Sequence, residues 1–239
     1  MMKITIIGYG RMGKEVEEMA LSRGHQVLLK IDKDNPEDFD SRLFVASDVA
    51  VEFSMPGTAF SNITRCIERG VPVISGTTGW TERLEELKKL VLEKDGTFLY
   101  ASNFSIGVNI LFKFNRELAA LMERMDEYRV ELSEVHHTAK KDAPSGTAIS
   151  LANDIINECS RYKSWYKDEH HDENGIGINC LREGNVTGTH TVKWQSFIDT
   201  ISIKHEAHNR KGFALGAIFA AEYVHKRKGV FTMSDVLGF

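Results

Sequence analysis

The chain has 239 residues, of which 42% are hydrophobic and 27% are charged, and its formal net charge is −4. A chain of this length and composition folds into globular domains with a sizeable core. The small negative charge argues against a general nucleic-acid or membrane-surface binder, since such proteins usually carry a basic excess. An anionic small molecule is not excluded, because it requires only a local positive site.

The cysteines and the apolar runs indicate a cytoplasmic protein. Cys66, Cys159 and Cys180 lie far apart and form neither a C-x-x-C pair nor a zinc-finger spacing, so we expect free thiols. The first apolar run is too short for a signal peptide, and no run approaches the roughly 20 residues of a membrane helix. We therefore expect a soluble protein that stays inside the cell.

The first hundred residues alternate apolar runs with amphipathic segments. The apolar runs predict strands over Lys3–Ile7, Gln26–Ile31, Val49–Ser54, Val71–Ser75 and Thr97–Ser102. The intervening patterns predict helices that end at Gly24, span Thr58–Arg69 and begin at Thr81. Strands that alternate with helices of about 10–15 residues predict right-handed βαβ units and a parallel sheet.

The pattern changes after Asn103. A long helix is predicted over Gly107–Met125, with apolar residues on one side at Ile110, Phe114, Leu118 and Leu121. Arg161–Asn174 is polar and irregular. The other predicted elements are a strand, a helix and three further strands over Tyr128–His136, Thr147–Cys159, Ile178–Arg182, His190–Trp194 and Phe197–His205. This half predicts an α+β domain with a mixed or antiparallel sheet.

The last predicted helix, Phe213–Lys226, has a small, packable face, and we expect it to return to the first domain. The predicted fold class is α/β, with a Rossmann-like doubly wound parallel sheet and a second α+β domain. We expect residues 1–103 and 213–239 to form a dinucleotide-binding domain. Residues 104–212 are expected to bind the substrate and to mediate oligomerisation.

A glycine-rich turn follows the first strand and opens a helix, with the sequence Gly8-Tyr9-Gly10-Arg11-Met12-Gly13. It fits the G-x-G-x-x-G pattern, in which the helix N-terminus receives a pyrophosphate. Asp32 ends the second strand, where an acid holds the ribose hydroxyls of NADH. The neighbouring Lys33 could instead pair with the extra phosphate of NADPH, so the choice stays open and we favour use of both.

Two further segments follow predicted strands, Gly76-Thr77-Thr78-Gly79 and Ala101-Ser102-Asn103-Phe104. The carboxyl ends of strands line the ligand crevice of a doubly wound sheet, so these segments are placed to meet the nicotinamide half of the cofactor. The alternative for each is an ordinary turn.

The segment Glu134–Ala148 runs from a strand through a loop into a helix and concentrates two histidines and two lysines. Gly146 and Thr147 open the helix, and a helix N-terminus binds a carboxylate as it binds a phosphate. Lys140 can neutralise a second negative charge, and a histidine can deliver a proton near neutral pH. This set suits the reduction of a small, anionic, unsaturated compound.

The same segment resembles the signature of the dihydrodipicolinate reductases, E-x-H-H-x-x-K-x-D-A-P-S-G-T-A, which is present in full. Other segments that resemble this family are Gly8–Gly13, Gly76–Gly79, Ala101–Asn109, Arg182–Gly184, Gly188–Thr191, Arg210 and Phe213-Ala214. Two segments depart from the family pattern. The stretch between Ile31 and Val49 is short, and His205–Arg210 lacks the usual small residues, so Arg210 is left outside the expected site.

The resemblance implies the activity and the roles of several residues. The substrate would be 4-hydroxy-tetrahydrodipicolinate, reduced by NADH or NADPH to tetrahydrodipicolinate with loss of water, in lysine and diaminopimelate biosynthesis. His136 resembles the general acid, and Lys140 the residue that holds and polarises the substrate. His137, Gly146 and Thr147 resemble carboxylate-binding positions. The resemblance also implies a homotetramer assembled through the sheet of the second domain.

Other interpretations remain open at this point. Adjacent residues of a strand point to opposite faces, so His136 and His137 face the same site only if the strand has ended. His170-His171-Asp172-Glu173 lacks a regular ligand spacing, and we expect a solvated loop and no metal. The chain could instead be another two-domain nicotinamide enzyme, such as an aspartate dehydrogenase, or a non-catalytic nucleotide-sensing protein.

Overall fold

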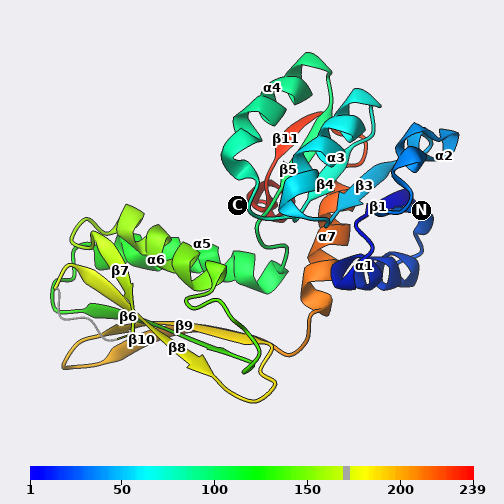
Figure 1. The fold of residues 1–239 in the computed structure, drawn as a ribbon. Coiled ribbons are helices and arrows are strands. Elements are labelled where there is room, and N and C mark those ends of the chain that lie inside the picture. Colours follow the sequence, from blue (N-terminus) through cyan, green and yellow to red (C-terminus); the bar gives the residue numbers. More distant parts are fainter. Residues whose placement is uncertain (169–172) are drawn as a thin grey trace. The chain divides into compact units, whose positions relative to one another are not determined.

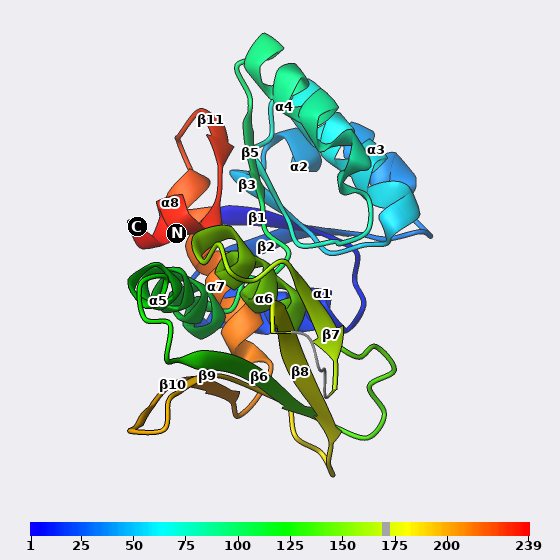
Figure 2. The ribbon, with the colours of Figure 1, turned by 90° about the vertical axis from the view of Figure 1, so that its left-hand side faces the viewer.

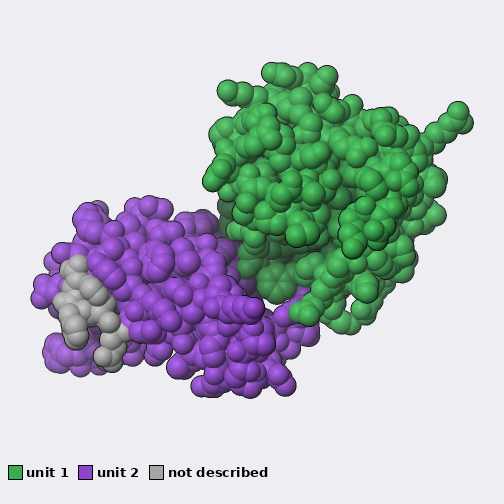
Figure 3. Space-filling model, viewed as in Figure 1, with its two compact units in different colours: residues 1–106, 211–239 green, residues 107–210 purple. Residues whose placement is uncertain are grey.

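The computed structural model describes residues 1–168 and 173–239, which form two compact units. The first unit contains Met1–Ile106 and Lys211–Phe239, and the second contains Gly107–Arg210 (Figure 3). Of the helices that the structure describes, none has the length and apolarity needed to cross a membrane.

The first unit is built on a six-stranded sheet in which all neighbouring strands are parallel. In sheet order the strands are β11 (Gly229–Phe231), β5 (Thr97–Tyr100), β4 (Val73–Ser75), β3 (Val49–Glu52), β1 (Lys3–Ile7) and β2 (Gln26–Ile31). The central strands read as continuous apolar runs because helices cover both faces of a parallel sheet.

Helices cover the two faces of this sheet as separate groups (Figure 1). One group packs into the core that contains Ile4 and Ile6, and consists of α1 (Arg11–Ser22), α7 (Lys211–Val224) and α8 (Met233–Leu237). The other contains the short helices η1 (Pro36–Asp40), α2 (Arg42–Val45) and η2 (Thr81–Arg83), with α3 (Pro56–Glu68) and α4 (Leu84–Glu93).

The second unit has a five-stranded mixed sheet, with α5 (Ile106–Met122) and α6 (Gly146–Glu158) on one face (Figure 2). Its strands, in sheet order, are β10 (Thr200–Ala207), β9 (Gly188–Gln195), β6 (Arg129–His136), β8 (Gly175–Arg182) and β7 (Ser164–Lys167). The first two pairings are antiparallel and the last two are parallel. The predicted fold class is therefore confirmed.

The structure corrects two expectations for the second unit. The stretch predicted to be irregular contains strand β7, which pairs in parallel with β8, the next strand of the chain. In α5 the side formed by Ile110, Phe114 and Leu121 is exposed. The buried side of α5 instead includes Asn115, whose amide nitrogen donates to the Leu151 carbonyl at 2.9 Å, so a polar residue marks the core face.

Candidate active site

In the glycine turn between β1 and α1, two glycines leave no room for a side chain unless neighbouring atoms move. Gly8 has φ +87°, and a Cβ there would lie 2.2 Å from the Phe53 carbonyl oxygen. A Cβ on Gly13 would lie 2.3 Å from the carbonyl oxygen of Gly8. A Cβ on Gly10 would meet nothing within 4 Å, so the backbone at this position faces open space. This is the arrangement that a close approach of a pyrophosphate requires.

Asp32 lies directly beside this turn. Its carboxylate accepts hydrogen bonds from the backbone nitrogens of Tyr9, at 3.2 Å, and Lys33, at 2.8 Å. Both side chains, of Asp32 and Lys33, are exposed and accessible to a ribose. The Tyr9 hydroxyl bonds to Glu17, which also pairs with Lys30, so Tyr9 is fixed against the middle of α1.

A pocket of about 370 Å³ lies against the turn. It brings together residues of three loops, namely Gly10, Arg11, Met12, Phe53, Ser54, Pro56, Gly76, Thr77 and Thr78. The glycine turn and the segment after β4, which the sequence predicted separately, thus contribute to the same cavity. Thr78 is exposed, whereas Thr77 is buried and its hydroxyl donates to Glu52.

The segment after β5 does not line this pocket. Ala101 and Phe104 are buried, and the Phe104 ring packs edge-on against Phe53 with ring centroids 5.6 Å apart. Ser102 is exposed and Asn103 is half-buried. Of the side chains in this segment, those of Ser102 and Asn103 are therefore accessible, whereas the Phe104 ring is not.

Sequence reasoning missed the turn after β3, which supplies Phe53, Ser54 and Pro56 to the pocket. The predicted strand continued to Ser54, but β3 ends at Glu52. The sequence did contain an indication of this turn. Glu52 and Ser54 are polar and stand at the carboxyl end of a predicted parallel strand, where ligands bind.

In the second unit, one face of β6 changes from apolar to polar toward its carboxyl end. Val130 and Leu132 pack in the core with α5 and α6, and Glu134 and His136 continue the same row. All four are buried, and Glu134 is 0% exposed. Alternation along the strand therefore turns His136 inward, while His137 follows the strand end and is half-buried.

The Glu134 carboxylate is surrounded by two side chains from neighbouring strands, one backbone nitrogen and the His136 ring of its own strand. It accepts hydrogen bonds from Arg182 Nη2 at 2.9 Å and from the Ser145 backbone nitrogen at 3.0 Å. His136 Nδ1 lies 3.6 Å and His190 Nε2 lies 3.8 Å from its Oε2 atom. Burial alone would raise the pKa of Glu134, but the bonds from Ser145 and Arg182 outweigh burial and hold the pKa below its ordinary value.

The two histidines pack edge-on, with ring centroids 5.1 Å apart. Burial lowers the pKa of His136, and the neighbouring Glu134 charge opposes that shift while Lys140 and Arg182 add to it. Burial, together with His136, lowers the pKa of His190 to about 4. His190 is therefore neutral near pH 7, and its Nε2 lies 3.1 Å from the Ser145 hydroxyl.

Lys140 and the start of α6 supply positive potential in the same unit. Lys140 Nζ contacts both carboxylate oxygens of Asp142, at 2.8 and 2.6 Å, and this pairing lowers the pKa of Asp142. Gly146 and Thr147 are the first two residues of α6, whose N-cap Ser145 accepts from the Ala148 nitrogen at 3.2 Å. A lysine and a helix N-terminus are both suited to anionic groups.

Glu134, His136 and His190 have ligand-type atoms within 4.8 Å of one another. Both oxygens of Glu134 already accept hydrogen bonds, one of them from a guanidinium, which disfavours a cation there. In the loop considered for a metal, His170, His171 and Asp172 lie outside the described residues.

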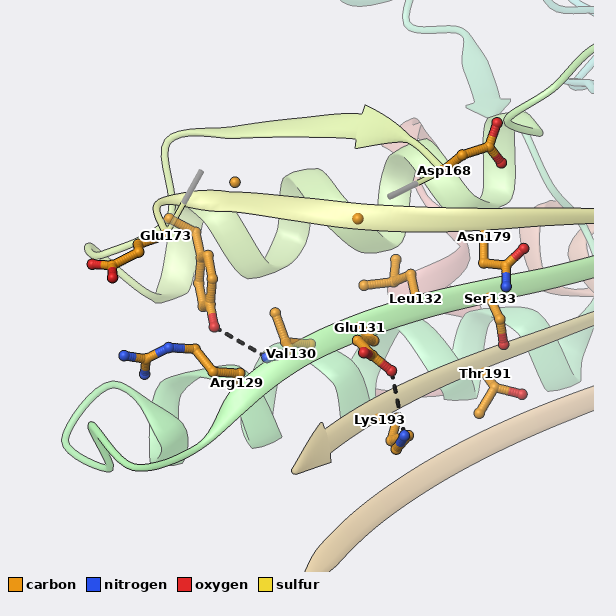
Figure 4. A pocket seen from close by; sticks show the side chains of 13 residues that line it. Arg129, Val130, Glu131, Leu132, Ser133, Asp168, Glu173, Asn179, Thr191 and Lys193 are labelled. Carbon is orange, nitrogen blue, oxygen red and sulfur yellow. Dashed lines mark hydrogen bonds and ion pairs between the residues drawn. The ribbon is translucent and has the colours of Figure 1, made fainter. Parts of the chain in front are cut away.

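On the face of the second sheet opposite α5 and α6 lies a separate, open depression of about 740 Å³ (Figure 4). Its polar lining includes Ser133, Asn179 and Thr191, and Lys193 pairs with Glu131 at 3.3 Å. These residues alternate along their strands with core residues, so they lie on the face opposite α5 and α6. No residue of the Glu134–Ala148 signature lines this depression.

The class of protein follows from the two units taken one at a time. The first has the fold and the glycine turn of a dinucleotide-binding domain. The second combines a buried histidine, a side-chain type suited to proton transfer, with cationic groups that suit an anionic substrate. Together they are typical of oxidoreductases that use NADH or NADPH.

Comparison with known proteins identifies the family. Residues 2–104 match the model of the dihydrodipicolinate reductase N-terminus, and residues 107–237 match that of the C-terminus. The chain belongs to the dihydrodipicolinate reductase family, whose members are NAD(P)H-dependent oxidoreductases. The resemblance seen in the sequence is thereby confirmed.

Individual relatives agree with this assignment. A 4-hydroxy-tetrahydrodipicolinate reductase of Christiangramia forsetii is 48% identical over 99% of this chain and 98% of its own length. The dipicolinate-bound dihydrodipicolinate reductase of Paenisporosarcina sp. TG-14 has the same fold, with a TM-score of 0.80, 22% identity and 97% of each chain covered. Aspartate dehydrogenase of Thermotoga maritima, the class of the rival hypothesis, shares the fold at a TM-score of 0.50, with 14% identity and coverage of 95% of this chain and 98% of its own.

Proposed function

We propose that this protein reduces 4-hydroxy-tetrahydrodipicolinate to tetrahydrodipicolinate, with NADH or NADPH as the reductant and water as the second product. The observation that carries the proposal is the buried Glu134–His136 pair beside Lys140 and the N-terminus of α6, in a chain of this family. The reaction belongs to lysine and diaminopimelate biosynthesis.

The first unit would bind the dinucleotide. Gly10 leaves open space for the pyrophosphate, Asp32 lies beside the turn to meet the ribose, and the adjoining pocket extends toward Gly76 and Thr78. The bound nicotinamide supplies the hydride. Arg11 and Lys33 are exposed near the turn and give a 2′-phosphate possible partners, so we propose that both cofactors are used.

The second unit would bind the dicarboxylate and deliver the proton. Lys140 exchanges its pairing with Asp142 for a substrate carboxylate, and Gly146 and Thr147 receive a carboxylate at the helix N-terminus together with His137. His136 donates the proton that balances the added hydride, and Glu134 stabilises its protonated form. The two carboxylates of the substrate lower the cost of protonating His136, because they offset the charges of Lys140 and Arg182.

We also propose a division of labour and an assembly. Residues 1–103 and 213–239 form the cofactor domain, residues 104–212 form the substrate domain, and four copies associate through the second sheet. The exposed Phe197 and Ile198 in the β9–β10 turn support association. Light scattering during size-exclusion chromatography tests the tetramer. We place the enzyme in the cytoplasm, where its cofactors are supplied.

The first test is the loss of nicotinamide absorbance, with substrate generated in place from aspartate semialdehyde and pyruvate by a coupling synthase. Protein-dependent loss, measured in parallel with NADH and NADPH, is the expected result. Folded protein that consumes neither cofactor, with the substrate supply verified by an authentic reductase, contradicts the proposal. Turnover of aspartate or a keto acid instead would favour the alternative dehydrogenase.

A further inference from the structure

A buried carboxylate lies behind the dinucleotide pocket of the first unit. Glu52 is the last residue of β3, is 0% exposed, and was not among the residues that the sequence predicted for the site. Among the described residues we find no ion pair that involves Glu52. Burying a carboxylate without a cationic partner is costly unless hydrogen bonds compensate, so its partners require an explanation.

Four hydrogen bonds from neutral donors converge on this carboxylate. Its Oε1 atom accepts from the backbone nitrogen of Ser54 at 2.9 Å, from the Ser54 hydroxyl, and from the Thr77 hydroxyl at 2.9 Å. Its Oε2 atom accepts from the Ser75 hydroxyl at 2.5 Å. Glu52 therefore links the turn that follows β3 to the turn that follows β4.

Two of these three partners line the pocket, and Glu52 itself does not. Ser54 and Thr77 belong to the lining, and the Ser54 nitrogen also lies 2.8 Å from the Thr77 hydroxyl oxygen. Ser75 lies on β4 behind them and does not line the pocket. The carboxylate thus contacts the pocket wall only from the protein side.

The turn after β3 is also packed against the glycine turn. The Phe53 carbonyl occupies the position that a Cβ on Gly8 would need, and the Phe53 ring lies 2.1 Å from the ideal Cβ position of Gly76. Three loops of the pocket therefore meet at Phe53, with Glu52 next to it in the chain. A substitution of Glu52 would therefore move Ser54 and Thr77, which line the pocket.

We propose that Glu52 is a positioning residue for the dinucleotide, because its carboxylate holds Ser54 and Thr77 in the arrangement that receives the cofactor before the cofactor binds. Such preorganisation raises affinity by removing the cost of ordering loops during binding. The inference rests on the proposed function, since it takes the pocket of the first unit to be the dinucleotide site.

Glu52→Gln is the direct test. The amide has nearly the same shape as the carboxylate, but its NH₂ group is a donor and cannot accept the hydrogen bonds that one carboxylate oxygen now accepts. We expect the Kd for NADH, measured by nicotinamide fluorescence without substrate, to rise about tenfold, equivalent to about 1.4 kcal/mol. The kcat at saturating NADH should change little, because the lost interaction supports the bound cofactor equally before and during reaction. Glu52→Asp, which keeps the carboxylate, should give an intermediate Kd.

Matched variants separate positioning from simple stabilisation. Ser75→Ala removes the hydrogen bond to Oε2 but leaves those from Ser54 and Thr77 in place, so it should lower Tm and raise the Kd for NADH by less than Glu52→Gln does. Thr77→Val removes the hydroxyl that joins Glu52 to a residue of the pocket lining, and should weaken NADH binding as Glu52→Gln does. The double variant should bind NADH little worse than either single variant, because both changes break the same link.

A Glu52→Gln protein that binds NADH as tightly as the wild type overturns the inference, whether or not its Tm falls. If that variant does not fold, unchanged NADH binding by Thr77→Val overturns it equally. Wild-type protein that binds neither NADH nor NADPH contradicts the proposed function instead, so the two failures are distinguishable.

Discussion

Two glycines of one turn should separate cofactor binding from folding. A Cβ on Gly10 meets nothing within 4 Å, and its φ of −78° lies outside the left-handed region that favours glycine. Gly10 is also the N-cap of α1, where alanine costs about 1 kcal/mol or less. In a chain of this size that lowers Tm by only about 2–4 °C. The new methyl group nevertheless takes up space that a pyrophosphate needs, so Gly10→Ala should weaken NADH binding at least about tenfold.

Gly13→Ala should have the opposite balance. Its Cβ would lie 2.3 Å from the Gly8 carbonyl oxygen and 3.3 Å from Ile6 Cγ2, so α1 must move away from β1 by about 1 Å to restore an ordinary contact. Overpacking of this kind costs about 1–3 kcal/mol, which lowers Tm by up to about 12 °C. The core contacts of Val16 and Ala20 would be disturbed as well.

Thermal unfolding by circular dichroism and titration of NADH fluorescence measure the two effects independently. We expect Gly10→Ala to bind NADH more weakly with a near-normal Tm, and the Tm of Gly13→Ala to fall further than that of Gly10→Ala. If Gly10→Ala binds NADH normally, the open side of Gly10 is not where the dinucleotide lies. If Gly13→Ala is as stable as the wild type, Gly13 does not pack as closely against the Gly8 carbonyl as the prediction assumes.

Three further predictions concern the second unit. His136→Gln should lower kcat at least about 100-fold, the scale of general acid catalysis, with the Kd for NADH unchanged; normal turnover would remove His136 from the mechanism. Lys140→Ala should raise the substrate KM about 10- to 100-fold and lower kcat. Asp142→Asn should lower KM by up to about fivefold, because it removes a largely exposed carboxylate that competes with the substrate for Lys140. A raised KM in Asp142→Asn would mean that Asp142 positions the lysine. The pKa of His190 in the folded state, about 4, lies below its ordinary value. As the pH falls, the unfolded chain therefore binds a proton at this histidine before the folded chain does. The free energy of unfolding should decrease between about pH 6.5 and pH 4, by up to about 3 kcal/mol. Urea unfolding at pH 7 and pH 5 should show that His190→Gln weakens this dependence, and an unchanged slope would contradict it.

The sequence predicted the elements whose pattern is local. The runs Lys3–Ile7 and Gln26–Ile31 are apolar enough to be identified as strands, and both match the structure. Strand β11 has three residues and β7 has four, and each forms because another strand supplies its hydrogen bonds, the distant β5 for β11 and the following β8 for β7. The orientation of α5 also depends on tertiary packing, because both of its sides are largely apolar.

The candidate site divides in the same way. His136, Lys140 and Gly146 are neighbours in the chain, and their motif made them visible. Arg182 and His190 reach the site through sheet register, since Arg182 pairs with His136 and His190 pairs with Glu134. Such pairings join residues about fifty positions apart, and no local pattern indicates them. The family resemblance included both segments but assigned neither residue a role.

Glu52 and Glu134 illustrate one structural solution used in both units. Each is a fully buried glutamate near the carboxyl end of a central strand, and each accepts a hydrogen bond from the backbone nitrogen of a functional loop, at Ser54 and Ser145 respectively. Glu134 also pairs with a guanidinium, whereas all four hydrogen bonds to Glu52 come from neutral donors. Serine and threonine side chains are shorter than an arginine side chain and can adjust less to a moved partner. The loops at Glu52 must therefore keep their positions if the buried carboxylate is to keep its hydrogen bonds. This requirement makes Glu52 the more sensitive position for loop geometry, and Glu134 the more sensitive one for the charge of its histidine.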